Sequence, residues 1–210
     1  MKQPAIVIVD YGVGNIHSVK SAIADLGYRK IRITADEKGI LDADALILPG
    51  VGAFEACIDH LKRLKLDVIL SEAVLSRKKP ILGICVGMQL MATHSEEKGC
   101  HRGLDWIPGR VVKLNPSGGL AVPHVGWNDI SHTSKDPIFS RTPESPSFYF
   151  DHSYHFQCDT AFISAQCDYG SQVTAAIQRD HIHGVQFHPE KSQNNGLKLF
   201  RGFFNTVSQC

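Results

Sequence analysis

The pentapeptide "GICVG" (residues 83–87) lies inside the stretch "PILGICVGMQLM" (residues 80–91). A short apolar run ends at Cys85, and a run with helical character begins directly after it. A cysteine that only packs in a core needs no glycine on either side. A nucleophile on a sharp strand-to-helix turn does need them, because its strained backbone leaves room only for small residues two positions away. The stretch therefore predicts a strand, a tight turn and a helix, with a thiol at the turn.

Apolar runs of strand length recur before this turn, at residues 5–10, 30–34, 43–50 and 79–85. The run at residues 5–10 is almost wholly apolar and rich in β-branched residues, which is typical of a strand buried on both faces of a parallel sheet. Segments of helical spacing separate or follow them, at residues 16–27, 55–66, 67–78 and 86–97. This alternation predicts an α/β fold of three layers, with a mostly parallel central sheet flanked by helices.

The pattern changes after about residue 99. Strands are predicted at residues 109–115, within 121–130 and, as one aromatic strand, at 147–158. Residues 162–190 resemble consecutive short strands with turns at Tyr169–Gly170 and Arg179–Asp180, and residues 194–207 resemble a helix. We expect these strands to add antiparallel partners to the first half's sheet, so that residues 1–210 form a single domain.

Composition excludes several classes of protein. The formal net charge is +1 and 20 % of the residues are charged, so no broad field favours nucleic acid or an anionic membrane. No apolar run approaches the ~20 residues of a membrane helix, and the start lacks the pattern of a signal peptide. We therefore expect a soluble, cytoplasmic protein whose six cysteines are reduced thiols, because no CxxC motif is present.

The eleven histidines leave a metal site open as a minor alternative. His152, His155 and Cys158 are spaced by three residues, and further histidines cluster between residues 181 and 188. The strand-like runs around them break any helical metal-binding face. We therefore expect neither a metal ion nor another cofactor.

The chemistry predicted for Cys85 follows from its place before a helix. A helix N-terminus favours the thiolate, and the backbone N–H of Val86 is placed to hold an oxyanion. The pentapeptide alone leaves a nucleophile and a packed core thiol equally open.

Two further motifs could complete a site. "GVQFHPEKS" (residues 184–192) offers His188 as a general base and Glu190 as the acceptor that orients it, although a surface loop is the commoner origin of such a segment. "LPGVGAF" (residues 48–54) follows a strand of the same sheet, so Val51 or Gly52 is a candidate second oxyanion donor; the alternative is a plain turn. "DYGVGN" (residues 10–15) lacks a third glycine and is weak as a nucleotide site.

The motifs "PGVGAF", "GICVGMQL", "SEE" and "GVQFHPEKS" together resemble those of class I glutamine amidotransferases. "DYGVGN", "PHVGWN" (residues 123–128) and "FYFDHSY" (residues 148–154) narrow the resemblance to the glutaminase subunits of imidazole glycerol phosphate synthases, from histidine biosynthesis. The resemblance extends from Ile6 to about Phe204.

The resemblance implies a mechanism in which Cys85 attacks the carboxamide of L-glutamine, His188 moves the proton and Glu190 orients His188. It implies an oxyanion hole formed by Val86 with Val51 and Gly52. The positions that match those around the bound glutamine are Gly50, Gln89, Glu97, Ser153 and Tyr154. A carboxylate at Glu97 suits the α-ammonium group of the ligand; otherwise Gln89 and Glu97 are solvated helix residues.

The resemblance also implies a partner, a (β/α)8-barrel cyclase that forms a heterodimer with this chain. The barrel uses the ammonia to make imidazole glycerol phosphate and aminoimidazole carboxamide ribotide. The positions that match the partner interface are Asn15, His124, Trp127, Tyr149 and Lys191.

Two departures leave rival interpretations open. Asp151 stands where the family usually has an apolar residue, and "GLDWIPG" (residues 103–109) departs from the usual opening. The same chemistry could supply ammonia to a synthase that amidates surface sugars. A free-standing cysteine hydrolase of the same fold would act without a partner, and a non-enzymatic binding module would keep Cys85 as a packing residue.

Overall fold

The computed structural model describes residues 3–133 and 136–207. Its main sheet has eight strands in the order β2-β1-β3-β4-β14-β13-β12-β9. These strands are β1 (Ile6–Val9), β2 (Ile31–Thr34), β3 (Ala45–Gly50), β4 (Ile81–Cys85), β9 (Ser131–His132), β12 (Ile163–Asp168), β13 (Gln172–Arg179) and β14 (Ile182–Val185). Strands β2, β1, β3, β4 and β14 run parallel, and β13, β12 and β9 continue the sheet in antiparallel pairs.

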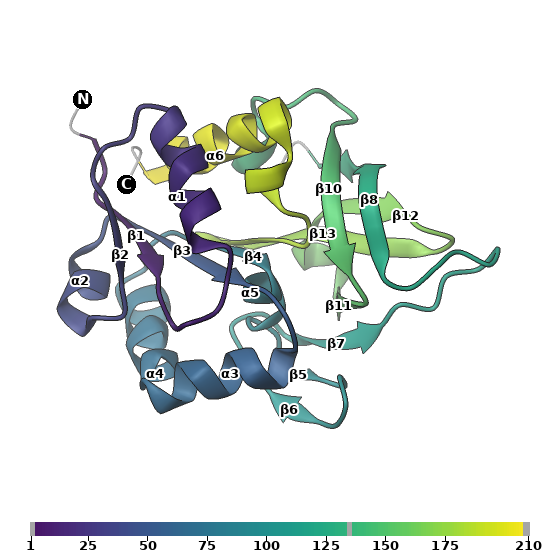
Figure 1. Ribbon diagram of the computed structural model, residues 1–210, viewed down its shortest axis with the longest axis horizontal. Coiled ribbons are helices and arrows are strands. Elements are labelled where there is room, and N and C mark those ends of the chain that lie inside the picture. Colours follow the sequence, from purple (N-terminus) through teal and green to yellow (C-terminus); the bar gives the residue numbers. More distant parts are fainter. Residues whose placement is uncertain (1–2, 134–135, 208–210) are drawn as a thin grey trace.

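Helices cover both faces of this sheet, which gives the predicted three layers. In Figure 1, α1 and α6 lie on one side of the central strands, and α3 and α4 lie on the other. The helices are α1 (Ile16–Asp25), α2 (Glu37–Asp42), α3 (Phe54–Arg63), α4 (Leu66–Ser71), α5 (Val86–Gln89) and α6 (Gln193–Val207), with a π-helical turn η1 (Glu72–Ser76) and 3-10 turns η2 (Pro137–Phe139), η3 (Thr160–Phe162) and η4 (Pro189–Lys191). No helix in the described part of the chain is long and apolar enough to cross a membrane.

The apolar runs identified in the sequence are the centre of the core. Every residue of β1, β3, β4 and β14 is buried, because both faces of these strands are covered. Helix α1 buries Ile16, Val19 and Ile23, whose spacing puts them on one face. The hydrophobic pattern therefore predicted β1, β3 and β4 correctly. Strand β14 was expected among the added antiparallel strands, but it runs parallel to β4.

The carboxyl ends of three neighbouring strands meet at one edge of the sheet. Gly50 at the end of β3 is in register with Cys85 at the end of β4, and Val185 at the end of β14 is in register with Ile84. The loop after β3, the turn after β4 and the segment after β14 therefore share this edge, where α/β proteins commonly bind ligands.

The predicted helix over residues 86–97 is wrong beyond its first turn. Helix α5 ends at Gln89, and the chain continues into β5 (His94–Ser95). The carbonyl groups of residues 90–92 accept hydrogen bonds from the backbone N–H groups of residues 104–107. This distant segment takes the acceptors that a longer helix would have used, and residue-to-residue spacing gives no sign of it.

The predicted strand over residues 147–158 is two strands in two sheets. Strand β10 (Ser147–His152) pairs with β8 (His124–Asp129), and β11 (Tyr154–Cys158) pairs with β7 (Gly109–Lys113). The chain changes sheet at Ser153, whose carbonyl accepts from the N–H of Leu114. The β11-β7 pair belongs to a four-stranded sheet with β5 and β6 (His101–Arg102). The second half thus extends the main sheet with only some of its strands, and the remainder form two small sheets beside the shared edge.

Candidate active site

Cys85 occupies a strained turn between β4 and α5. Its φ is 55° and its ψ is −113°, a conformation that non-glycine residues seldom adopt. A Cβ on Gly83 would come within 2.7 Å of the carbonyl oxygen of Gly87, and a Cβ on Gly87 would collide with the carbonyl oxygen of Leu48. The two glycines are therefore needed so that the strand, the turn and the helix can pack this closely.

His188 and Glu190 form a buried pair beside this turn. His188 Nδ1 lies 2.8 Å from Glu190 Oε1, and the two side chains are 4 % and 1 % exposed. The segment is fixed by its backbone, because the N–H of His188 donates to the carbonyl of Tyr149 and the Ser192 hydroxyl donates to the carbonyl of His188. Pro189 opens η4, so the 3-10 turn itself brings residues 188 and 190 together.

The environment of His188 favours its charged form. Burial disfavours the imidazolium, but hydrogen bonds and charge interactions with Cys85 and Glu190 outweigh burial and raise the pKa of His188 to about 10. His188 therefore carries its proton as an imidazolium beside the sulfur of Cys85 near neutral pH. Such a pair can deliver a proton to a leaving group as soon as the sulfur attacks.

Further polar groups surround the sulfur atom. Gln186 Nε2 donates to Cys85 Sγ at 3.8 Å, and Cys85 Sγ lies 4.0 Å from the backbone carbonyl oxygen of Asp151. Gln186 is fully buried on the segment after β14. The sequence motif did not single out Gln186, although its position two residues before His188 on an extended segment places it on the same face.

A pocket of about 280 Å³ opens over Cys85. This volume is at the small end of ligand sites and suits an amino acid better than a nucleotide cofactor. Of the residues singled out in the sequence, those that line it are Val51, Gly52, Cys85, Val86, Gln89, Glu97, Asp151, His152, Ser153, Tyr154, His188 and Lys191, and Pro123 completes the lining.

Gln89 and Glu97 are both held within this site. Gln89 is 3 % exposed, and its Nε2 donates to the carbonyl of Tyr154 at 2.9 Å and to Gln186 Oε1 at 3.0 Å. Glu97 Oε2 accepts the N–H of Phe54 at 2.8 Å. Gln89 is thus not a solvated helix residue, and Glu97 lies beyond β5 and not at a helix end.

The glycine-rich loop after β3 is fastened from behind by two buried side chains. The Tyr11 hydroxyl donates to the carbonyl of Pro49 at 2.7 Å, and Cys57 Sγ donates to the carbonyl of Val51 at 3.4 Å. Burial, reinforced by the neighbouring Cys85, raises the pKa of Cys57 to about 11 although the hydrogen bond with Tyr11 lowers it, so Cys57 remains a thiol donor. Gly50 itself is not among the residues that line the pocket, and a Cβ on it would come within 2.6 Å of the amide nitrogen of Gly87, so only glycine fits there. The hydrogen bonds from Tyr11 and Cys57 therefore hold the 49–50 and 51–52 peptides.

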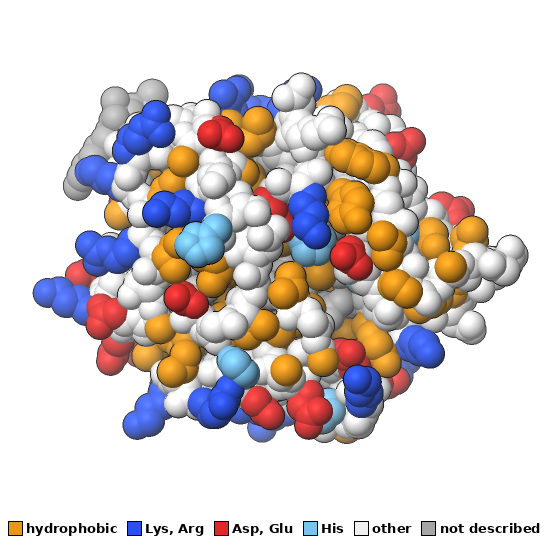
Figure 2. Space-filling model, viewed as in Figure 1, with side chains coloured by type: hydrophobic (Ala, Val, Ile, Leu, Met, Phe, Trp, Pro, Cys, Tyr) orange, Lys and Arg blue, Asp and Glu red, His pale blue; other side chains and the backbone are white. Residues whose placement is uncertain are grey.

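Three of the residues predicted at a partner interface form a surface cluster. Trp127 is 49 % exposed and makes an edge contact with the ring of Tyr149 at 6.3 Å. Lys191 Nζ lies 5.3 Å from the centre of the Tyr149 ring. Hydrophobic side chains gather over β8 and β10 on the face shown in Figure 2, next to basic and acidic side chains. Exposed aromatic side chains beside a cation are typical of an interface.

The other two predicted interface residues have internal contacts. Asn15 Nδ2 donates to Glu190 Oε1 at 3.4 Å, so Asn15 supports the carboxylate of the buried pair. His124 is only 2 % exposed and stacks between Phe150 and Tyr169. The expectation that the His124 side chain itself faces a partner is corrected, because the inward pleat of β8 places the ring in the interior.

The histidine series considered as a metal site is dispersed. His152 faces the pocket and His155 lies on β11, while Cys158 ends that strand. Among residues 3–133 and 136–207, no three histidine, cysteine, aspartate or glutamate side chains come together in a group that could hold a metal ion. The free thiols in this part of the chain form no disulfide.

Comparisons with known proteins agree with this geometry. Residues 7–207 match the family model described as "Glutamine amidotransferase class-I". "Imidazole glycerol phosphate synthase subunit HisH 2" of Vibrio vulnificus is 44 % identical over 202 residues, which cover 96 % of this chain and 94 % of the relative. "Imidazole glycerol phosphate synthase subunit HisH" of Archaeoglobus fulgidus is 44 % identical over 204 residues, which cover 97 % of this chain and all of the relative.

Solved structures share the fold at low sequence identity. A chain of PurLQS from Thermotoga maritima superposes with a TM-score of 0.73 at 18 % identity, covering 98 % of this chain and 100 % of that one. The glutaminase domain of CTPS from Trypanosoma brucei, with bound acivicin, gives a TM-score of 0.64 at 18 % identity, covering 95 % of this chain and 93 % of that one. At this identity the likeness concerns the fold alone.

Proposed function

The chain belongs to the class I glutamine amidotransferase family, and on that premise we propose that Cys85, His188 and Glu190 are its catalytic residues. The observation that carries the proposal is the side chain of His188, buried beside the sulfur of Cys85 and 2.8 Å from the carboxylate of Glu190, at a small pocket that Cys85 and His188 line. A thiol, a proton donor and an orienting carboxylate are the parts that acyl transfer from an amide requires.

The reaction is glutamine hydrolysis in two steps. The Cys85 thiolate attacks the carboxamide carbon, and protonated His188 gives its proton to the nitrogen as the carbon–nitrogen bond breaks and ammonia leaves. Water then attacks the thioester carbon and gives a proton to His188, the carbon–sulfur bond breaks, and glutamate and the Cys85 thiolate are released. Glu190 keeps the ring of His188 oriented toward the sulfur through its hydrogen bond to Nδ1.

The oxyanion formed in both steps requires backbone donors. We assign this part to the N–H of Val86, at the first turn of α5, and to the loop of Val51 and Gly52. Tyr11 and Cys57 hold the carbonyl groups on the far side of that loop, which limits the rotation of its peptides.

The glutamine itself is assigned to the remainder of the pocket. Glu97 supplies a carboxylate for the α-ammonium group, and the Ser153–Tyr154 backbone with Gln89 forms the opposite wall. Asp151 at the pocket rim adds a carboxylate that the family pattern does not include, and its backbone carbonyl lies near the sulfur.

The enzyme is a subunit of a larger assembly in histidine biosynthesis, like its relatives of more than 40 % identity named as imidazole glycerol phosphate synthase subunits. We propose that the partner is a (β/α)8-barrel cyclase that receives the ammonia and forms a heterodimer with this chain. The exposed cluster of Trp127, Tyr149 and Lys191 beside the pocket supports this assignment, because ammonia must pass from the site to the partner without escaping.

Glutamate release from glutamine tests the proposal. The chain is assayed alone, with a histidine-pathway cyclase barrel, and with the barrel plus its phosphoribulosyl ligand, and Cys85→Ala accompanies each mixture. We expect the chain alone to release almost no glutamate and the barrel with its ligand to stimulate release strongly. We expect no release from Cys85→Ala in any mixture. Trp127→Ala should weaken stimulation at low barrel concentration and recover at high concentration.

The same assay separates the rival functions. Full turnover by the chain alone would indicate a free-standing hydrolase. No glutamate release in any mixture, together with alkylation of Cys85 by a glutamine-like electrophile, would support the glutaminase chemistry but exclude this barrel as the partner. Release that survives Cys85→Ala would overturn the proposed catalytic residues.

A further inference from the structure

Two buried histidines outside the catalytic group contact each other under the β8–β10 pair. His124 and His152 stand opposite each other in the register of these strands. His124 Nδ1 lies 3.0 Å from His152 Nε2. His152 lines the active-site pocket, while His124 lies one layer further away from it.

The neighbours of this pair fix the position of each ring proton. His152 Nδ1 lies 2.9 Å from the carbonyl oxygen of Tyr154, and a carbonyl can only accept, so the proton of His152 is on Nδ1. His152 Nε2 is then an acceptor, and His124 must donate to it from Nδ1. His124 Nε2 in turn accepts from Asn128 Nδ2 at 3.3 Å. The second amide hydrogen of Asn128 donates to the carbonyl of Asp168 at 2.9 Å.

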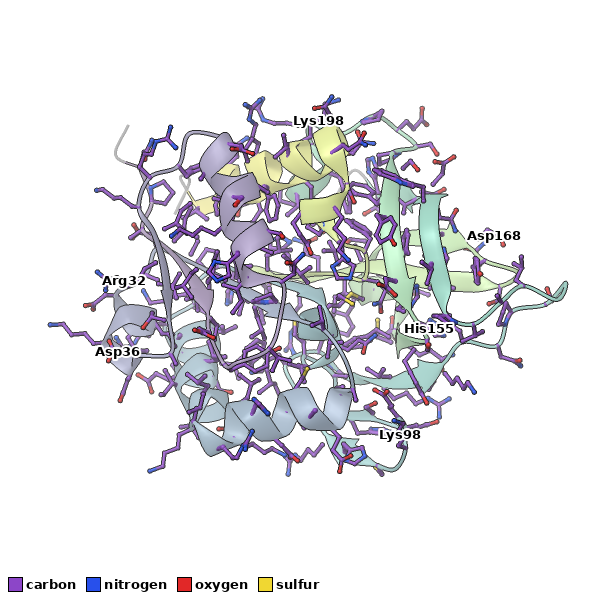
Figure 3. The ribbon with its side chains drawn as sticks, viewed as in Figure 1. Arg32, Asp36, Lys98, His155, Asp168 and Lys198 are labelled. Atoms are coloured by element: carbon purple, nitrogen blue, oxygen red, sulfur yellow. The ribbon has the colours of Figure 1, made fainter. Side chains whose placement is uncertain are left out.

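The result is a chain of hydrogen bonds in which Asn128 donates to both sides, outward to the carbonyl of Asp168 and inward to His124. From Asn128 inward, every donor points toward the pocket. The hydrogen-bond chain runs from the β12–β13 turn, where Figure 3 labels Asp168 at the outer end of the sheet, to the wall of the pocket. Both rings must be neutral for it to exist, since a second proton on either would place two donors face to face. Burial lowers the pKa of His124 to about 4 and the pKa of His152 to about 3, which agrees with this requirement.

The inner end of the chain reaches the glutamine site. The carbonyl of Tyr154 accepts from both His152 Nδ1 and Gln89 Nε2. Gln89 Nε2 also donates to Gln186, whose own amide donates to Cys85 Sγ. The carbonyl of Tyr154 therefore links the histidine pair to Gln89 in the pocket wall and, through Gln186, to the sulfur of Cys85.

We propose that His124 and His152 are positioning residues of the glutamine site, which hold the Ser153–Tyr154 backbone and the amide of Gln89 where glutamine binds. The inference rests on the function proposed above. The outer face of β8 presents Val125 and Trp127, which are 53 % and 49 % exposed, while the inner face carries His124. A partner that packs on Trp127 therefore contacts β8, the strand that also carries His124.

The ring tautomers provide a test that needs no activity. Long-range proton–nitrogen correlation spectra of the chain labelled with ¹⁵N-histidine report which ring nitrogen carries the proton. We expect both rings to be neutral with the proton on Nδ1 at pH 7, assigned by the signals lost in His124→Phe and His152→Asn. A proton on Nε2 of either ring, or an imidazolium at pH 7, would overturn the inference.

Kinetics of the assembled enzyme test the effect on the substrate. His124→Phe keeps an aromatic ring between Phe150 and Tyr169 but cannot donate to His152. We expect the KM for glutamine to rise roughly tenfold, because that is the effect of losing one buried hydrogen bond. We expect kcat to stay within about twofold of the wild-type value. His152→Asn keeps a donor near the Nδ1 position, so it should retain a lower KM than His152→Ala.

The matched control is His155→Phe. His155 is also a buried histidine, lies on β11 as labelled in Figure 3, and takes no part in this chain. An unchanged KM in His124→Phe, or an equal rise in His155→Phe, would refute a specific positioning role. If wild-type enzyme with its barrel released no glutamate, the proposed function would fail, whereas the tautomers would still decide the hydrogen-bond chain.

Discussion

Replacing Glu190 by glutamine should move the alkaline limit of glutamine hydrolysis toward neutral pH. Glu190 Oε1 lies 2.8 Å from His188 Nδ1 in a site from which water is nearly excluded. Glutamine has the same size and can still accept from Nδ1 through its amide oxygen, so the substitution removes a charge and little else. The change therefore isolates the electrostatic contribution of Glu190 to the imidazolium.

The structure gives the magnitude. Burial opposes the charged ring, yet contacts with Cys85 and Glu190 raise the pKa of His188 from 6.5 to about 10. This corresponds to roughly 5 kcal/mol in favour of the imidazolium. An opposite charge in contact is worth about 1 to 3 pH units, so the pKa of His188 should fall to roughly 7 to 9 in Glu190→Gln. His152 also faces this ring but stays neutral, so it does not compensate.

The consequences for rate and stability have the same sign. In the proposed mechanism His188 must carry a proton for ammonia to leave, so wild-type kcat should persist up to a pH of about 10 and then fall. If the pKa of His188 in Glu190→Gln is near 8, the kcat of this variant should be about tenfold lower at pH 9 than at pH 7. Because the folded pKa of His188 exceeds the unfolded one, this group stabilises the fold fully below pH 6.5, and the contribution is lost as the pH rises through about 10.

The assay is glutamate release by the barrel-stimulated enzyme between pH 6.5 and about 10.5, with glutamine saturating at each pH. Glu55→Gln is the control, since Glu55 lies 3.8 Å from a histidine, His101, but is 55 % exposed and does not line the pocket. If kcat fell at the same alkaline pH in Glu190→Gln and in the wild type, the reasoning would be refuted, because the charge of Glu190 would then not raise the pKa of His188.

Three other substitutions examine separate parts of the structure. Cys85→Gly and Cys85→Ala should both abolish hydrolysis. The glycine variant should have the larger free energy of unfolding, by about 1 kcal/mol, and the higher melting temperature, because glycine adopts the positive φ of residue 85 without strain. A more stable alanine variant would contradict the strain at this residue. Asp136→Ala leaves His183 buried without its partner at 3.1 Å and should lower the free energy of unfolding in urea by about 3 to 5 kcal/mol, whereas a loss below 1 kcal/mol would show that the pair is not a stabilising contact. Tyr11→Phe releases the carbonyl of Pro49 and should lower kcat about fivefold to tenfold in steady-state assays at unchanged KM; a change in KM alone would place Tyr11 with substrate binding and not with the oxyanion loop.

Local features of the chain were predicted well because they depend on a few neighbouring residues. The buried strands β1, β3 and β4, the turns at Tyr169–Gly170 and Arg179–Asp180, and the elbow at Cys85 all follow from hydrophobic runs and glycine positions. The parallel order of the strands then brings the loop after β3 and the turn after β4 to one edge of the sheet. Residue types and spacing thus placed a thiol between two glycines at the end of a strand.

Pairings between distant segments were beyond the sequence. Helix α5 stops at Gln89 because residues 104–107 take the next backbone acceptors. The strand predicted over residues 147–158 divides at Ser153 because its two halves find partners in different sheets.

The environment of each site residue was likewise decided by the tertiary structure. His124 was expected on the surface, but the pleat of β8 turns its ring inward against His152. Asn15 was expected to face a partner, but it also supports Glu190, 175 positions along the chain. The identity of a side chain and its neighbours in sequence determine which chemistry it can perform. Its charge state and its hydrogen-bond partners depend on burial and on contacts across the sheet, which exist only once the chain has folded.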